Sequence, residues 1–488
     1  MGMFITGYWP VWAPIRKQVE TTGNQQKSDF SKGSVPGNIL RLALPMTFAQ
    51  LINVLYSVID RMYIGHIPDA AANALTGIGL TFPIISIVSA FANLFGTGGA
   101  PLFSIERGRR ENQRAEKIMG NTFAMLLCTG VLLTIVILLI KKPLLYLFGA
   151  SDITYPYADS YLTIYLCGSV FVMTGLGMNP FINAQGFGRM GMMTVLLGAV
   201  VNIVLDPVFI FVFDMGVAGA ALATVIAQFA SAAWAISFLT GKRALLKLRI
   251  CHMKIQFSLV KRITGLGTSG FIMNITNSLV QIVCNSTLQI FGGDLYVGVM
   301  TVLNSVREIV MTPVSGVTSA TQPVLGFNYG AGEYRRVRSG IKFMSFVCMV
   351  YTVVTWLILL LFPTFFIQIF SSDPALTQAC VPSMHIYFFG YFMMSLQMAG
   401  QSTAVGLGRS KQAIFFSLLR KAIIVVPLTL LLPRVFGLGV TGVFLAEPIS
   451  NFIGGTACYV TMLLTIWKEL KKKESQKESC PLPTPPKL

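Results

Sequence analysis

The residues GFGR at 186–189 return about 220 positions later as GLGR at 406–409. Three further pairs keep the same order and nearly the same spacing: LFGASD at 147–152 with IFSSD at 369–373, Pro207 with Pro427, and GVAG at 216–219 with GVTG at 439–442. Four matches in one order argue against chance similarity between glycine-rich loops. The sequence therefore predicts a chain built from two repeated halves.

The segments that flank these motifs are too apolar for a water-soluble core. Hydrophobic residues make up 54% of the 488-residue chain and charged residues only 11%, so lipid must surround much of it. Successive apolar runs approach or exceed the roughly 20 residues that one helix needs to cross a bilayer. We predict an all-α membrane protein with twelve transmembrane helices, at 39–66, 74–103, 118–141, 156–179, 189–213, 217–240, 260–291, 297–325, 339–362, 381–405, 412–436 and 440–467.

The repeat also predicts how the two halves are related. Six spans per half is an even number, so both halves enter the membrane in the same orientation. They form two six-helix lobes around a pseudo-two-fold axis along the membrane normal, with a substrate cavity between them. The predicted domains are a cytoplasmic segment at 1–38, an N-lobe at 39–240, a basic cytoplasmic connector at 241–259, a C-lobe at 260–467 and a disordered tail at 468–488.

The formal net charge of +18 indicates orientation rather than nucleic-acid binding. Basic residues cluster in the loops after even-numbered spans, above all at 107–117, 242–262 and 335–342. The loops on the other side carry Asp69, Asp152, Asp214, Asp294 and Asp373. Because cytoplasmic loops are rich in Lys and Arg, both termini are predicted to face the cytoplasm.

Two acidic side chains fall inside the predicted spans of the N-lobe, where lipid disfavours charge. Asp60 lies in the first span and Asp206 in the fifth, directly before Pro207. Asn202 precedes Asp206 by one helical turn and lies on the same face. Pro207 cannot donate to the carbonyl group of Ile203, so we expect a kink there. A charged residue in a span is expected to face a cavity and to be functional.

Distances along the chain indicate that these groups lie at one depth. Asp60 precedes His66 of the outer loop, while Asp206 and Thr224 flank Asp214 of another outer loop. At ~1.5 Å per residue, all three side chains lie roughly 10–15 Å below the outer surface. Two carboxylates, an amide and a hydroxyl form an oxygen-rich set that suits a hard cation or protons. The alternatives are a surface pair of Asp60 with Arg61, and ordinary interhelical hydrogen bonds for the amide and hydroxyl.

The second half contains no matching acidic pair. Glu308 lies near the outer third of the eighth span, and Glu447 lies in the twelfth span before Pro448. Each is a candidate for a second coupling acid, for a substrate contact or for a structural partner.

These features resemble the multidrug and toxin extrusion (MATE) family, in particular its MepA-like bacterial branch. The resemblance covers nearly the whole chain. Its strongest parts are LALP at 42–45, DRMYIG at 60–65, Asn202 with Asp206 and Pro207, and QPVLGFNYGA at 322–331.

The resemblance implies an outward-open, V-shaped cavity and export of cationic drugs driven by entry of Na⁺ or H⁺. It implies that the N-lobe cation site consists of Asp60, Asn202, Asp206 and Thr224, with no further metal, and that the first helix bends at Pro45. Some relatives carry an acidic residue in the tenth span. None stands between Pro382 and Val405, so the resemblance does not extend to a C-lobe cation site.

We therefore expect a multidrug efflux antiporter of the bacterial inner membrane rather than an enzyme. It would act as a monomer on cationic or amphipathic small molecules, contact lipid but no nucleic acid, and need no cofactor beyond H⁺ or Na⁺. A major-facilitator antiporter is one alternative, because GRR at 108–110 faintly resembles its loop signature, although Glu106 and Arg107 stand where Asp is usual. A lipid-linked precursor flippase is another alternative. It would be expected to line its central cavity with several cationic residues, and the sequence offers few of them.

Overall fold

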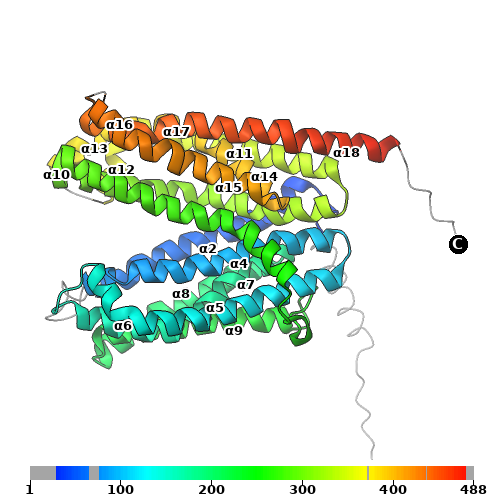
Figure 1. Ribbon diagram of the computed structural model, residues 1–488, viewed down its shortest axis with the longest axis horizontal. Helices are drawn as coiled ribbons and strands as arrows, with labels where there is room; N and C mark the ends of the chain where they lie inside the picture. The colour runs from blue at the N-terminus through cyan, green and yellow to red at the C-terminus, as the bar shows by residue number, and fades with distance from the viewer. Residues whose placement is uncertain (1–28, 65–75, 371–372, 436, 480–488) are drawn as a thin grey trace, which may run out of the picture.

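The computed structural model describes residues 29–64, 76–370, 373–435 and 437–479. Helices account for nearly all of these residues, and the described parts contain no strand. Two bundles lie side by side along the long axis of the molecule: α2 to α9 form one, and α10 to α18 form the other (Figure 1). The predicted all-α fold with two lobes is confirmed.

The N-lobe contains six spans, two of which are interrupted. Its elements are α2 (Val35–Ile64), α4 (Phe82–Gly108), α5 (Asn112–Leu147), α6 (Tyr155–Cys167), α7 (Ser169–Ala184), α8 (Gly188–Pro207), the π-helix η1 (Val208–Val212) and α9 (Gly216–Thr240). Helices α6 and α7 form one span bent by 56°. His66 and Asp69 of the predicted outer loop lie outside the described residues.

The C-lobe repeats this plan with its own interruptions. Its elements are α10 (Phe257–Gly330), α11 (Tyr334–Leu361), α12 (Pro363–Gln368), α13 (Pro374–Tyr387), α14 (Met393–Gly406), α15 (Ser410–Leu418), the π-helix η3 (Leu419–Val425), α16 (Val426–Val435), α17 (Gly439–Met462), the π-helix η4 (Leu463–Trp467) and α18 (Lys468–Ser479). The 74-residue α10 holds two predicted spans, because Gly293 breaks it with a φ of 65°. Glycine adopts this left-handed conformation without a Cβ clash.

The lobes touch closely along α4 and α10. A Cβ atom on Gly267 would lie 1.7 Å from the carbonyl oxygen of Leu94, and one on Gly330 would lie 2.0 Å from that of Ile105. Because glycine has no side chain, the two backbones can approach each other closely at these positions, as in other membrane helix pairs. The contact runs to the ends of α4 and α10 that carry the basic loops, and it closes the space between the lobes there.

The connector is held against the N-lobe by side-chain hydrogen bonds. Gln185 Oε1 accepts from the backbone N–H groups of Leu245 and Leu246 at 2.9 and 3.1 Å. Glu116 Oε1 accepts from the N–H of Lys247 at 3.1 Å. This segment includes the short 3-10 helix η2 (Ile250–His252). The hydrogen bonds hold the connector against the surface of the N-lobe.

The expectation of a disordered tail is wrong for residues 468–479. They form α18, which continues from α17 through η4. Lys473 Nζ lies 2.8 Å from Glu469 one turn earlier, and Lys477 Nζ lies 2.8 Å from Glu333. Charge pairs of this kind stabilise a polar helix. Composition alone could not reveal the contact with Glu333, which precedes α11.

Candidate ion-coupling and substrate site

The polar cluster in the N-lobe is built from α8 and α9. Asn202 Nδ2 donates to Asp206 Oδ1 at 3.0 Å and to Thr224 Oγ1 at 3.4 Å. Asp206 is 0% exposed and Asn202 is 1% exposed. The one-turn spacing on α8 stacks the amide above the carboxyl. Asn202 Oδ1 is buried and accepts no hydrogen bond from the described residues.

A glycine and a proline shape the backbone around this cluster. A Cβ atom on Gly198 would lie 2.2 Å from Ser231 Oγ, so glycine leaves room on α8 for this hydroxyl group of α9. Pro207 ends α8, and the π-helix η1 begins at the next residue. The missing N–H of proline disturbs the helical ladder here, and π-helical turns are often found at functional sites. The expected irregularity at Pro207 is thus a change of helix type.

Asp60 on α2 completes the cluster. Its carboxyl group lies near that of Asp206, and the two interact electrostatically. Two adjacent negative charges repel each other, which favours a proton or another cation on the pair. The pair can therefore hold a proton, or a cation that takes the proton's place.

Tyr161 on α6 also belongs to this cluster, and sequence reasoning missed it. Its hydroxyl group hydrogen-bonds Thr224, and the residue interacts electrostatically with Asp60. Its ring stacks on that of Tyr165, one turn later, with the centroids 6.3 Å apart. Two tyrosines at helical spacing in a span were a weak sequence signal, because aromatic residues are common in membrane helices.

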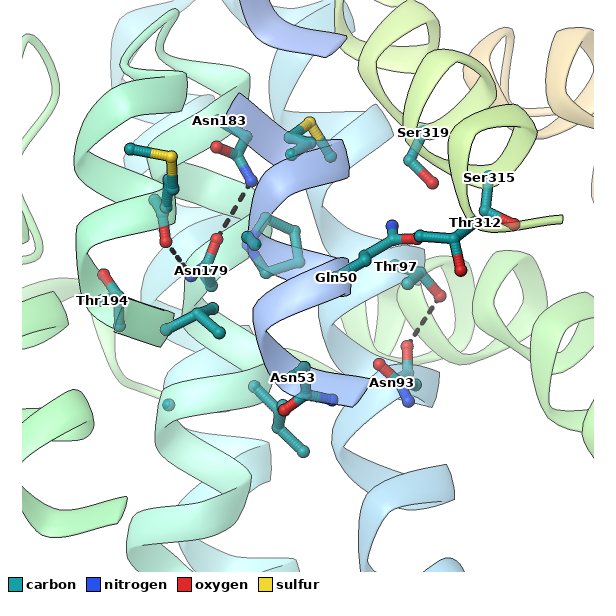
Figure 2. A pocket seen from close by; sticks show the side chains of 18 of the residues that line it. Gln50, Asn53, Asn93, Thr97, Asn179, Asn183, Thr194, Thr312, Ser315 and Ser319 are labelled. Atoms are coloured by element: carbon teal, nitrogen blue, oxygen red, sulfur yellow. Dashed lines mark hydrogen bonds between the residues drawn. The ribbon is translucent and has the colours of Figure 1, made fainter. Parts of the chain in front are cut away.

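A cavity of about 730 Å³ lies beside this cluster. Its wall is rich in amide and hydroxyl groups, several of which Figure 2 shows around the open space. Some already have partners: Asn179 Nδ2 donates to the carbonyl oxygen of Gly191 at 2.9 Å, and Asn183 Nδ2 donates to Asn179 Oδ1 at 3.0 Å. Both lobes contribute, since α2, α4, α7, α8, α9, α10 and α14 all provide lining residues.

The cavity and the carboxyl cluster share residues. Asn202 and Thr224 line the cavity while they hydrogen-bond within the cluster. Across the cavity, Glu308 of α10 is the only charged residue among the described lining residues. Glu308 is exposed and takes part in no ion pair among the described residues.

Pro45 lies inside α2, which continues through it as one helix. The neighbouring Met46 and Ala49 line the cavity. The residue is thus positioned beside the cavity, and its role in bending stays a prediction.

Glu447 of the C-lobe has a different environment from Glu308. Three cationic side chains surround it: Arg307 at 3.4 Å, Arg420 at 3.1 Å and Lys421 at 3.1 Å. Arg420 and Lys421 were not among the residues predicted from the sequence, although two adjacent cations inside an apolar span are a visible signal. Paired in this way, Glu447 is a structural partner, and it does not line the central cavity.

Two lobes of apolar helices around a cavity of drug-sized volume, with buried carboxyl groups beside its wall, define a multi-pass membrane transporter. The family model MatE matches residues 45–208 and 271–431. The chain belongs to this family, the MATE transporters.

Individual relatives and solved structures agree with this assignment. The chain is 24% identical to the multidrug export protein MepA of Staphylococcus haemolyticus over 438 residues, which cover 88% of this chain and 94% of the relative. It is 24% identical to MepA of Staphylococcus aureus strain N315, covering 91% and 96%.

Two solved structures share the fold. A crystal structure of MATE in the bent conformation matches with a TM-score of 0.87 at 21% identity, covering 92% of this chain and 99% of that one. A MOP-superfamily transporter from Pyrococcus furiosus, whose title reports reverse polarity of the binding pocket, matches with a TM-score of 0.85 at 21% identity, covering 91% and 99%.

Proposed function

We propose that this protein is a secondary active multidrug antiporter that exports cationic or amphipathic small molecules in exchange for H⁺ or Na⁺. One observation carries the proposal: Asn202 and Thr224 belong both to the cavity wall and to the cluster around Asp206. An ion that enters the cluster changes the charge and hydrogen bonding of the surface against which a substrate rests. Two ligands that compete through shared groups exclude each other, which is the requirement for exchange.

The coupling ion supplies enough energy for this task. Entry of one positive charge down a membrane potential of 100 mV releases about 2.3 kcal/mol, which supports a concentration gradient of roughly fifty-fold for a substrate without net charge. One-for-one exchange with a monovalent cationic substrate moves no net charge and is driven by the concentration gradient of the coupling ion. Asp60, Asp206, Asn202 and Thr224 provide oxygen ligands, and these suit H⁺ and Na⁺ better than zinc or copper. The described residues contain no group of three or more His, Cys, Asp or Glu side chains that could hold a metal ion.

The cavity supports the proposed substrate class. Its volume of about 730 Å³ falls within the range of drug-sized ligand pockets, roughly 300–1,000 Å³. Apolar side chains such as Met273, Met311 and Met398 adapt to varied shapes. Glu308 offers a negative charge to a cationic group. The staphylococcal relatives carry the name multidrug export protein, which agrees with broad specificity.

We further propose a bacterial cytoplasmic membrane location, with both termini in the cytoplasm, and function as a monomer. The basic residues at 107–117 and 335–342, at the starts of α5 and α11, lie at the end of the bundle where α4 meets the C-terminal end of α10. The positive-inside rule assigns that end to the cytoplasm. The close inter-lobe contact at this end then leaves the central cavity accessible from outside.

Transport in proteoliposomes tests the proposal. A Na⁺ gradient and a pH gradient are imposed separately, and the movement of a fluorescent cationic dye is followed. We expect saturable dye transport that one of the two gradients drives and that reverses with the direction of the gradient. Dye movement that neither gradient changes, or that equals movement in empty liposomes, would refute antiport.

The substitution Glu308→Gln tests the substrate class. We expect the apparent affinity for cationic dyes to fall by up to about fivefold, since a solvent-exposed charge contact contributes up to roughly 1 kcal/mol. Transport of a neutral amphipathic drug should change little. Glu111→Gln is the matched control, because Glu111 is a half-exposed carboxylate outside the cavity. An equal loss for both drugs would mean that Glu308 does not select charge.

A further inference from the structure

The C-lobe encloses more positive than negative charge around Glu447. Arg307 comes from α10, Arg420 and Lys421 come from the π-helix η3, and Glu447 comes from α17. Among the ion pairs of the described residues, Glu447 is the only carboxylate that any of these three cations contacts. Three formal positive charges thus meet one formal negative charge inside the lobe.

The hydrogen bonds converge on one side of the carboxylate. Glu447 Oε1 accepts from Arg307 Nη1 at 3.4 Å, from Arg420 Nη1 at 3.1 Å and from Lys421 Nζ at 3.1 Å. Glu447 Oε2 accepts only from Lys421 Nζ, at 3.3 Å. Arg420 also donates to Asn451 Oδ1 at 2.5 Å, but its Nε is buried without a partner among the described residues. One carboxylate does not satisfy the donors gathered around it.

This excess charge is buried, so water does not compensate it. The side chains of Lys421 and Arg420 are 3% and 5% exposed, and that of Arg307 is 26% exposed. A buried charge without a counter-charge costs several kcal/mol. Another negative group near these cations would lower this cost.

A small cavity of about 20 Å³ opens beside the excess charge. Lys421 and Arg307 line it, together with the Glu447 carboxylate and the polar side chains of Asn277, Gln281, Asn304 and Tyr387. The Tyr387 hydroxyl donates to Asn304 Oδ1 at 3.3 Å, which leaves the Asn304 amide nitrogen as a donor. Donors and cations therefore converge on a space that holds about one water-sized particle.

We propose that this cavity binds a monatomic anion, chloride under physiological conditions. The charge excess and the converging N–H donors select an anion, and the volume excludes phosphate, sulfate and organic acids. The bound anion would pair with Lys421 and Arg307, whose two positive charges outweigh the one negative charge of Glu447 in the cavity wall. The proposal does not depend on antiport, because it concerns neither the central cavity nor the cluster around Asp206.

Halide titration of the purified full-length protein tests the proposal. The protein is prepared in gluconate, and thermal unfolding is followed while chloride or bromide replaces gluconate at constant ionic strength. We expect the midpoint temperature to rise and to saturate with halide concentration, because a ligand that binds only the folded state stabilises it. Sulfate at the same ionic strength should have no such effect. A midpoint that halide and sulfate change equally would overturn the proposal.

The substitution Lys421→Met sharpens the test by removing one positive charge beside the cavity. We expect halide affinity to fall by about tenfold or more. Stability in gluconate should not fall, since two arginines still pair with Glu447. Lys141→Met is the matched control, because Lys141 forms a balanced pair with Asp159 at 2.7 Å, and it should keep the halide response. An unchanged halide affinity in Lys421→Met would refute this site. Should that variant not fold, the wild-type titration still decides, together with an anomalous bromide signal at Lys421 in a crystal.

Discussion

The two lobes place different chemistry at corresponding positions of the repeat. Glu447 follows Gly439 by the same number of residues as Thr224 follows Gly216, and Tyr387 follows Phe370 as Tyr165 follows Phe148. In the N-lobe, the carboxyl groups of Asp60 and Asp206 meet an amide and hydroxyls. In the C-lobe, one carboxylate meets three cations.

This difference explains how a symmetric scaffold performs an asymmetric task. Carboxyl groups with neutral neighbours gain from the arrival of a cation, because the ion removes their mutual repulsion. A carboxylate that already has cationic partners gains nothing from another cation. We therefore infer that only the N-lobe couples to an inward ion, while the C-lobe cluster stabilises its own lobe. Four substitutions test this inference, beginning with the largest expected effect.

Removing the N-lobe acid should abolish coupling. We expect Asp206→Asn to reduce gradient-driven dye efflux to the level of empty liposomes, because the pair with Asp60 can no longer exchange a proton or cation. Asp159→Asn is the control, since Asp159 pairs with Lys141 away from the cavity wall. Asp206→Asn should still insert and keep its unfolding temperature. Unchanged efflux would contradict the assignment of the coupling site.

Removing the C-lobe acid should affect stability rather than coupling. Glu447→Gln leaves three buried cations without a carboxylate, which is expected to cost about 3–5 kcal/mol of unfolding free energy. The double substitution Glu447→Gln with Lys421→Met should recover part of this loss, as measured by thermal unfolding. If the protein that does fold loses ion coupling while retaining dye binding, the two lobes are functionally alike and the comparison fails.

A neutral ligand of the N-lobe site should contribute less than its acids. Asn202→Ala removes an amide that donates to Asp206 and offers a free oxygen to the ion. One such hydrogen bond to a charged group contributes about 1.5 kcal/mol, so the affinity for the coupling ion should fall by about tenfold. The ion concentration for half-maximal efflux measures this. Asn451→Ala, the amide beside Glu447, should leave that concentration unchanged.

The smallest effect is expected for the tyrosine beside the cluster. Tyr161→Phe keeps the ring stacked on Tyr165 but removes the hydroxyl that bonds Thr224. We expect a reduction of about two- to fivefold in ion affinity, since a neutral hydrogen bond contributes roughly 0.5–1 kcal/mol. Tyr387→Phe in the C-lobe should leave ion affinity unchanged. A larger loss for Tyr387→Phe would reverse the proposed roles of the lobes.

Much of the fold and part of the candidate site could be predicted from the sequence. The apolar runs predicted the spans, and Gly293 separates the two that α10 contains. The repeat predicted two lobes, and the scarcity of acids in spans identified Asp60 and Asp206. Tail residues 468–479 were misjudged, because their helix depends on contacts such as Arg338 with Glu474 that composition does not contain.

The sequence by itself determined that lipid surrounds the protein, how many spans it has and that its two halves are repeats. These properties follow from hydrophobicity within single segments and from the spacing of motifs along the chain. Tertiary structure decided which acid has neutral neighbours and which has cationic ones. Arg307 lies 140 positions from Glu447, and the π-helix η3 buries both Arg420 and Lys421. The electrostatic environment of a buried group depends on neighbours that folding brings within about 4 Å, and no local pattern along the chain specifies them.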